Sequence, residues 1–243
     1  MTELQQKIWE WAEDAVAKYL NMVRGGWDYG FYTQSDLRTI SESPEYFIIQ
    51  INPGSGGTYS QQKMNDYWDL NGQDMDAAHF IKGNYGVNPT ETNKKTAWER
   101  RMEWSNFRKL RTLFSRVENG NPLDDTKKFI LTNASPFNTV HATKEVYKTL
   151  PKTLPITLSL IDITHPKRII VLGCDLRPYF SRIVKDCEVR ETSLSRIYYG
   201  EIYGIETLFI DHPSARTSKE GTKNVLRLWN TMPLEEAIEK ASA

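Results

Sequence analysis

The chain has 243 residues, and its 31 Lys and Arg residues equal its 31 Asp and Glu residues, so the formal net charge at pH 7 is zero. This length fits one domain with a substantial core, and a composition of 39% hydrophobic and 26% charged residues excludes a disordered or fibrous chain. Zero net charge excludes a protein that coats nucleic acid by bulk electrostatics, but a local basic surface is still compatible with it.

No apolar stretch approaches the roughly 20 residues of a bilayer span, and the charged residues Glu3, Lys7 and Glu10 argue against a signal peptide. Two cysteines, Cys174 and Cys187, cannot build a disulfide framework and indicate a reducing compartment. We therefore expect a monomer without a membrane partner, in the cytoplasm or, in a eukaryote, in the nucleus.

Apolar residues at helical spacing predict an N-terminal helix within residues 1–25, which Gly25 and Gly26 end. Short apolar runs predict four principal strands at 46–51, 128–131, 168–172 and 206–210, with a further strand at 197–203 beside the last. Helices are expected at 98–117, 175–185, 218–229 and 234–240, and at 143–163, where two prolines should break the helix. Residues 58–97 have little regular pattern and predict a long, insertion-like loop region of functional importance.

Strands that alternate with helices predict one α/β domain over residues 1–243, a three-layer sandwich around a central, mainly parallel four-stranded sheet. In such sheets ligands bind beyond the carboxyl ends of the strands. Three of the four strands end in small and polar residues, at 52–54, 133–135 and 212–214. This repeated placement predicts a site at that edge of the sheet.

Several kinds of site are excluded by the residues themselves. The Gly-rich loop at 52–57 lacks the lysine and hydroxyl spacing of a phosphate-binding P-loop and the second GxxG of a dinucleotide fingerprint. A Ser55–His212–Asp211 triad is rejected, because adjacent residues on a strand point to opposite faces and no G-x-S-x-G elbow is present. The histidines and cysteines show no metal-ligand spacing, so we expect no metal and no cofactor.

Positive charge gathers locally between residues 94 and 116, where eight basic residues stand against two acidic ones. This segment fits either a solvated helix face with ion pairs or a face that contacts phosphates. Trp98, Trp104 and Phe107 interleave with the bases, which suits stacking on nucleobases as well as core packing.

Taken in order, the strand ends resemble the uracil-DNA glycosylase superfamily. Ile51-Asn52-Pro53-Gly54 is similar to its first motif, in the Asn-Pro-Gly version of the mismatch-specific and single-strand-selective monofunctional branches. The sequence from Asp211 to Ser218 (DHPSARTS) is similar to its His-Pro-Ser-Pro second motif, with Ala215 in place of the last proline and Arg216 in place of the leucine wedge. The strand that ends at Asn133 lies where the family has its base-reading asparagine.

The resemblance implies a uracil-DNA glycosylase-like fold, DNA as the partner and excision of uracil or a related base from single- or double-stranded DNA. It implies that His212 stabilises the departing base and that Asn52 orients the attacking water. Asn133 would read the base edge, with Tyr59, Trp68 or Trp98 as the stacking aromatic. The phosphate-binding or strand-wedging groups would be Gly54, Ser55, Gly56, Ser214 and Arg216.

Two other interpretations are open on the sequence alone. The chain could keep the fold and bind nucleic acid or a flipped base without chemistry, because its first motif departs from the family pattern. It could also be a hydrolase or transferase for a nucleoside or another small molecule, using His212 and the Gly-rich loop.

Overall fold

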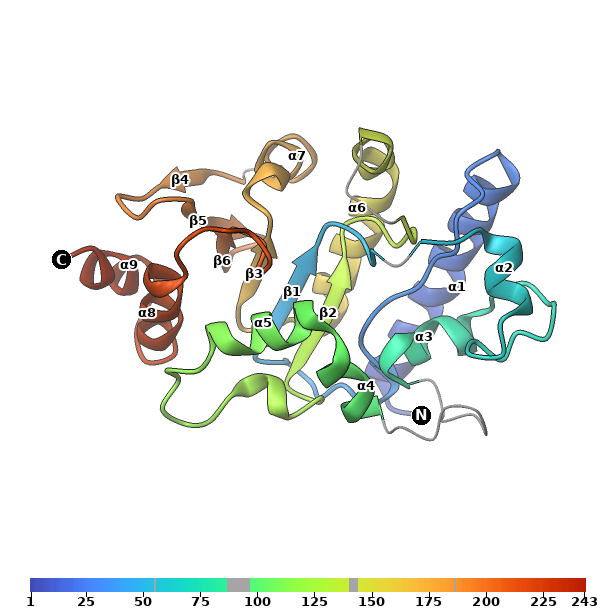
Figure 1. Cartoon of the computed structure of the whole chain (residues 1–243), viewed down its shortest axis with the longest axis horizontal. Coiled ribbons are helices and arrows are strands. Elements are labelled where there is room, and N and C mark those ends of the chain that lie inside the picture. The colour runs from blue at the N-terminus through green and yellow to red at the C-terminus, as the bar shows by residue number, and fades with distance from the viewer. Residues whose placement is uncertain (55, 87–96, 140–143, 186) are drawn as a thin grey trace.

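One mixed sheet of six strands organises the computed structural model, in the spatial order β2-β1-β3-β6-β5-β4 (Figure 1). The structure describes residues 1–54, 56–86, 97–139, 144–185 and 187–243, and for residues 97, 98 and 100 it describes the backbone alone. The strands are Tyr46–Gln50 (β1), Phe129–Asn133 (β2), Ile169–Leu172 (β3), Val189–Glu191 (β4), Ile197–Ile202 (β5) and Ile205–Ile210 (β6).

The parallel part of the sheet contains the four strands that the sequence predicts. β2, β1, β3 and β6 run parallel, so their carboxyl ends lie at one edge. The prediction of a four-stranded sheet is corrected to six, because β5 turns back antiparallel on β6 and the short β4 pairs with β5. β4 has only three residues, none of them fully buried, and therefore lacks an apolar run that could reveal it.

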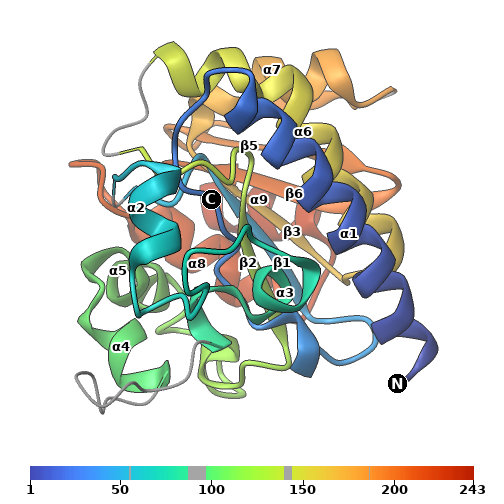
Figure 2. The ribbon, with the colours of Figure 1, turned by 90° about the vertical axis from the view of Figure 1, so that its right-hand side faces the viewer.

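Helices cover both faces of the sheet, which gives the expected three layers (Figure 2). One face packs Phe47 and Ile49 against α1 (Glu3–Arg24) and α6 (Lys144–Thr164), with α7 (Arg177–Ile183) nearby. The opposite face packs Tyr46 and Ile48 against α5 (Ser105–Leu113), α8 (Glu220–Trp229) and α9 (Leu234–Ser242). Strict alternation along the strands explains this division, since successive side chains point to opposite faces.

The expected loop over residues 58–97 forms α2 (Tyr59–Met64) and α3 (Ala77–Gly86) within the described residues 58–86. α2 is short and polar, and a capping box from Thr58 and Gln61 begins it, which hydrophobic periodicity does not detect. Residues 87–96 of the predicted loop lie outside the described part of the chain.

Two predicted helices also differ in their continuity. The helix expected at 98–117 is divided into α4 (Ala97–Glu103) and α5, because Trp104 adopts an extended backbone conformation. The helix expected to break at its prolines continues through Pro151 and Pro155 as α6. Buried apolar residues along α6 hold it against the sheet, so tertiary packing overrides the local preference. Three short 3-10 turns complete the described elements, at Leu37–Thr39, Pro122–Asp124 and Cys174–Leu176.

Candidate functional site

A narrow pocket lies at the carboxyl ends of the four parallel strands, on the face that α5 covers. Its volume is about 20 Å³, which is room for about one water molecule. Strand and strand-end residues, the Gln34 segment, and the ends of α3 and α5 contribute its walls, namely Gln34, Gln50, Pro53, Tyr85, Trp104, Asn106, Phe107, Leu110, Leu131, Leu172, His212 and Pro213. The edge at which the sequence predicts a site therefore carries a pocket, and both motif loops reach it.

His212 follows β6 and lines this pocket as a neutral imidazole. Burial, together with the positive charges of Lys219 and Lys109, lowers the pKa of His212 from its ordinary value of 6.5, so the ring is uncharged at pH 7. Its Nδ1 accepts a hydrogen bond from the backbone N–H of Ser214 at 3.3 Å. This assignment puts the ring proton on Nε2, which makes Nε2–H a donor for a ligand.

The loop that carries His212 is anchored by Asp211, whose side chain points elsewhere. The Asp211 carboxylate accepts hydrogen bonds from Arg196 Nε at 2.5 Å and Thr217 Oγ1 at 2.9 Å. Burial opposes ionisation, but these bonds and the Arg196 charge lower the pKa of Asp211. Lys219 Nζ donates to the His212 carbonyl at 3.2 Å. Asp211 thus positions the loop and does not form a triad with His212, in agreement with the rejected hydrolase geometry.

Asn52 follows β1 and is buried beside the pocket wall, next to the lining residue Pro53. Its Nδ2 donates to the backbone carbonyl and to Oγ1 of Thr139, both at 2.8 Å. The bond to a carbonyl fixes the amide, because only the nitrogen can donate. Its Oδ1 then remains as an acceptor.

The Gly-rich loop after Asn52 uses backbone conformations that favour glycine. Gly54 and Gly56 have φ values of 81° and 76°, and the Gly56 carbonyl accepts from Asn138 Nδ2 at 2.9 Å. Gly54 is exposed, and Ser55 lies outside the described residues. Within the second motif loop, Ser214 and Arg216 are exposed, and Ser214 Oγ donates to Asn106 of α5.

Asn133 ends β2 with a buried side-chain amide. Its side chain is 2% exposed, and neither Nδ2 nor Oδ1 has a hydrogen-bond partner in the part of the chain that the structure describes. Strand alternation places Asn133 on the same face as the pocket residue Leu131, and its registered neighbour on β1 is Gln50, another pocket residue. Thr157 Oγ1 of α6 donates to the Asn133 carbonyl at 2.7 Å.

Two of the three predicted stacking aromatics, Tyr59 and Trp68, do not line this pocket. Tyr59 is 4% exposed, its ring stacks on Phe31 at 5.4 Å, and its hydroxyl accepts from Met75 N at 2.7 Å. Trp68 is partly buried against Tyr32, with ring centroids 4.7 Å apart. Both are structural aromatics of the opposite core. Trp98 lies in α4, and its side chain is outside the described residues. The pocket aromatics are Tyr85, Trp104 and Phe107 instead.

The described side chains of the basic segment divide into those with an acidic partner and those with another role, whereas Lys94, Lys95 and the side chain of Arg100 lie outside the described residues. Arg111 pairs with Asp124, and Arg116 pairs with Glu220. Arg101 is 4% exposed and stacks on the Tyr85 ring at 4.3 Å, so it is a core residue. Lys109 is exposed and its charge acts on His212. The ion-pair interpretation holds for Arg111 and Arg116, whereas Lys109 adds positive potential near the pocket.

The cysteines and acidic residues provide no second centre within the described residues. Cys174 is buried, and burial, reinforced by Asp211, raises the pKa of its thiol to about 11, so it is a poor nucleophile. Cys187 is buried in the core beside α7. Within the described part of the chain, no group of three His, Cys, Asp or Glu side chains could hold a metal ion.

Sequence interpretation passed over Gln34 and Tyr85, both of which line the pocket. Gln34 lies in an irregular segment before β1, and Tyr85 lies in the predicted loop, so no periodicity marks either residue.

Comparison with protein-family models and with curated proteins gives no match for this chain. In the described part of the chain, every helix is too short or too polar to cross a bilayer.

Proposed function

We propose that the chain is a DNA glycosylase that hydrolyses the N-glycosidic bond of uracil or a related damaged base, as in base-excision repair. The observation that carries the proposal is His212, a neutral imidazole that lines the pocket and whose Nδ1 is already bonded, which leaves Nε2–H as a donor for a ligand. The order of the two motif loops and their meeting at one pocket support the same function.

His212 acts electrostatically in this proposal. Cleavage of the bond between base and deoxyribose produces a cation-like sugar and an anionic base, and the nucleotide must first leave the stack. A preorganised donor beside the carbonyl oxygen that gains charge stabilises the transition state more than the ground state. Because His212 is neutral and Ser214 holds its Nδ1, it donates without giving up its proton.

Asn52 supplies the place for the attacking water. Thr139 occupies its Nδ2, so Oδ1 is the atom that can accept a hydrogen bond from a water molecule. An amide orients water but cannot remove its proton, and we therefore expect slow turnover. Asn133, with one donor and one acceptor that lack partners in the described residues, matches the edge of a uracil ring, which offers both a carbonyl and an N–H.

Exposed and partly exposed groups around the pocket suit a DNA backbone. Lys109 and Arg216 provide positive charge, and the backbone of Gly54 and Gly56 and the hydroxyl of Ser214 can approach phosphates. A few such contacts are compatible with zero net charge. The pocket itself must widen, since about 20 Å³ holds a water and not a base.

The narrow pocket favours a second candidate, a member of the same fold that binds nucleic acid without chemistry. Cleavage distinguishes the two. A single-stranded oligonucleotide with one uracil is incubated with the protein and then cut at abasic sites with alkali. We expect cleavage by wild type and a loss of about a hundred- to a thousand-fold in His212→Ala, the size typical of a removed oxyanion donor.

His165→Ala is the matched control, because His165 is exposed and lies just before β3, at the opposite edge of the sheet. It should cleave like wild type. If neither wild type nor His212→Ala gives cleavage of the oligonucleotide at high enzyme concentration, glycosylase activity on this substrate is excluded. DNA binding that weakens steeply with salt would then favour the binding protein, and absent binding would favour a small-molecule enzyme.

A further inference from the structure

Two buried polar groups at the pocket have no partner in the described residues and no role in the mechanism above. Gln34 is 0% exposed, and its Nε2 has no hydrogen-bond partner in that part of the chain. The Tyr85 hydroxyl, on a side chain that is 5% exposed, is likewise unpartnered there. Both residues line the same pocket as His212. Buried donors without partners are rare in proteins and costly, so their position beside a pocket points to a ligand.

A chain of hydrogen bonds fixes which atom Gln34 presents. The Tyr67 hydroxyl donates to Asn84 Oδ1, and Asn84 Nδ2 donates to Gln34 Oε1 at 3.4 Å. With Oε1 facing Asn84, the atom of the Gln34 amide that has no partner in the described residues is Nε2, which can only donate. Burial raises the pKa of the Tyr85 hydroxyl, so it stays protonated and can also donate.

The backbone around Gln34 is held rigidly against α3. Asn84 N donates to Thr33 O at 2.8 Å, and Tyr85 N donates to Gln34 O at 2.9 Å. The approach is so close that a Cβ on Gly83 would lie 2.2 Å from the Ser35 carbonyl oxygen. A donor on a backbone held in this way is preorganised, because little conformational freedom of the residue remains to be lost when a ligand binds.

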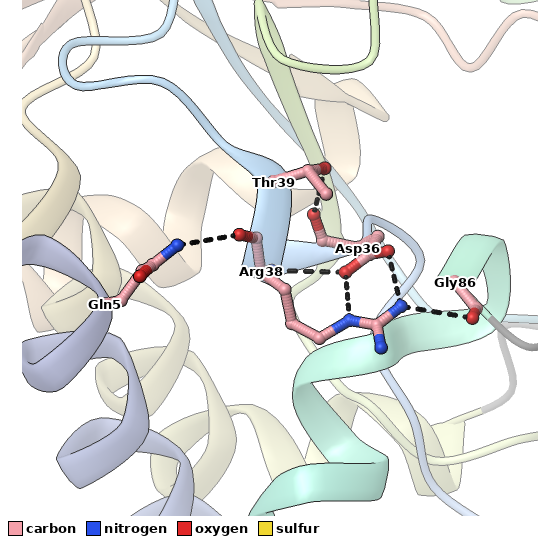
Figure 3. A network of polar contacts seen from close by, with 5 residues as sticks. All are labelled: Gln5, Asp36, Arg38, Thr39 and Gly86. Carbon is pink, nitrogen blue, oxygen red and sulfur yellow. Dashed lines mark hydrogen bonds and ion pairs between the residues drawn. The ribbon is translucent and has the colours of Figure 1, made fainter. Parts of the chain in front are cut away.

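A polar network just after Gln34 in the chain connects the segment that carries Gln34 to two helices (Figure 3). Arg38 donates to both carboxylate oxygens of Asp36 at 2.8 Å and to the carbonyl of Gly86, at the end of α3, at 3.3 Å. Gln5 of α1 donates to the Arg38 carbonyl at 3.1 Å. The network fixes the segment that carries Gln34 relative to the helix that carries Tyr85.

We propose that Gln34 is a specificity residue that donates from Nε2 to a ring carbonyl of the bound base, with the Tyr85 hydroxyl beside it. The substrate class is then a base that presents a ring carbonyl to these donors, of which uracil is the example. Cytosine would place its amino group, a donor, against these donors and would leave them unpaired. The inference rests on the proposed glycosylase function and names the base it selects.

The test compares affinity for two non-cleavable probes by fluorescence anisotropy. Single-stranded oligonucleotides of identical sequence carry either 2′-fluoro-2′-deoxyuridine or 2′-fluoro-2′-deoxycytidine at one position, since the fluorine slows glycosidic cleavage. Wild type should bind the uracil probe more tightly. Gln34→Met, which keeps the volume and removes the donor, should weaken uracil binding about ten- to a hundred-fold and leave cytosine binding unchanged.

Two further variants complete the test. Gln73→Met is the control for the substitution itself, because Gln73 is exposed and outside the pocket, and it should keep the wild-type preference. Tyr85→Phe removes only a hydroxyl that has no partner in the described residues, so it should fold even if Gln34→Met does not, and it should lose part of the preference.

The outcomes separate the two proposals. A uracil preference that survives in both Gln34→Met and Tyr85→Phe overturns the specificity role while leaving the glycosylase standing. A wild-type protein that cleaves no uracil and prefers neither probe overturns both. A preference lost in Gln34→Met, with cytosine affinity unchanged, supports the inference, because a merely structural defect would weaken both probes alike.

Discussion

The segment from residue 30 to residue 36 is held in two different ways on its two flanks. Toward α2, a side chain satisfies the backbone, because Gln62 Oε1 accepts from Phe31 N at 2.9 Å and Gln62 Nε2 donates to Phe31 O at 3.0 Å. Toward α3, backbone satisfies backbone, through the bonds from Asn84 N and Tyr85 N. The second arrangement leaves the Gln34 Nε2 without a partner in the described residues.

This contrast separates a structural glutamine from a candidate ligand-binding one. Both Gln62 and Gln34 are buried, yet both amide atoms of Gln62 are bonded while Gln34 has a donor at a pocket. Tyr59 and Tyr85 differ in the same way, since the Tyr59 hydroxyl is bonded to Met75 and the Tyr85 hydroxyl is unpartnered in the described residues. Burial alone does not separate the two kinds of polar residue, whereas an unpartnered donor beside a pocket makes Gln34 and Tyr85 candidates for ligand binding.

The largest expected effect comes from breaking the α3 flank with Gly83→Ala. Gly83 has a φ of 56°, and its Cβ would lie 2.2 Å from the Ser35 carbonyl oxygen, so the backbones must separate. We expect a loss of roughly 3–5 kcal/mol in the free energy of unfolding, from strain and overpacking together. Urea denaturation measures the loss.

Gly120→Ala is the matched control for the backbone strain alone. Gly120 also has a positive φ, 88°, but no atom of the described residues lies within 4 Å of the point where its Cβ would stand. It should cost about 1–2 kcal/mol. Equal losses for the two variants would show that the close approach of Gly83 to the Ser35 carbonyl does not stabilise the packing of this segment against α3.

The next effect is expected on the α2 flank, where Gln62→Leu leaves the N–H and the carbonyl of Phe31 without their partners. Each unsatisfied buried group costs about 1–3 kcal/mol, so the expected loss in unfolding free energy is roughly 2–4 kcal/mol. Gln73→Leu, at an exposed position, should change stability by less than about 0.5 kcal/mol. A loss below about 1 kcal/mol for Gln62→Leu would contradict the structural role.

The pH dependence of cleavage tests the pocket side through His212. The pKa of His212 lies below 6.5, and the neutral form, with Nδ1 free to accept from Ser214, predominates above that pKa. Cleavage should be flat at neutral pH and should fall as the pH drops through the His212 pKa, by about tenfold, or 1.4 kcal/mol, per unit below it. An activity that rises as the pH falls from 7 to 6 would require a charged imidazole and would contradict this role.

The pattern of the sequence was sufficient for the parallel strands and for the edge where the pocket lies. Apolar runs mark buried parallel strands, and the small and polar residues after them mark the edge of the sheet where His212 lines the pocket. Gln34 could not be predicted in this way. Gln34 is a candidate because its Nε2 has no partner in the described residues. This depends on its contacts with Asn84 and Tyr85, which lie far along the chain in α3.

The direction of the Tyr59 side chain could not be predicted from the sequence pattern either. Tyr59 follows the first motif closely, and its position in the sequence favoured a site role. A capping box at Thr58 instead begins a helix that turns the Tyr59 ring into the core against Phe31. Local hydrogen bonding thus decided the direction of a side chain that spacing alone could not fix.

The smallest expected effect on stability is that of Gln34→Met. Methionine has nearly the same volume, and the substitution removes a buried donor that has no partner in the described residues while giving up one long hydrogen bond, 3.4 Å from Asn84 Nδ2. Removing the unsatisfied donor is favourable, and this offsets most of the cost of leaving the buried Asn84 Nδ2 without its long hydrogen bond. We expect an unfolding free energy within about 1 kcal/mol of wild type, measured by urea denaturation beside Gln62→Leu. A loss as large as that of Gln62→Leu would mean that Gln34 stabilises the fold in the free protein, and the contrast between the two flanks would no longer point to a ligand.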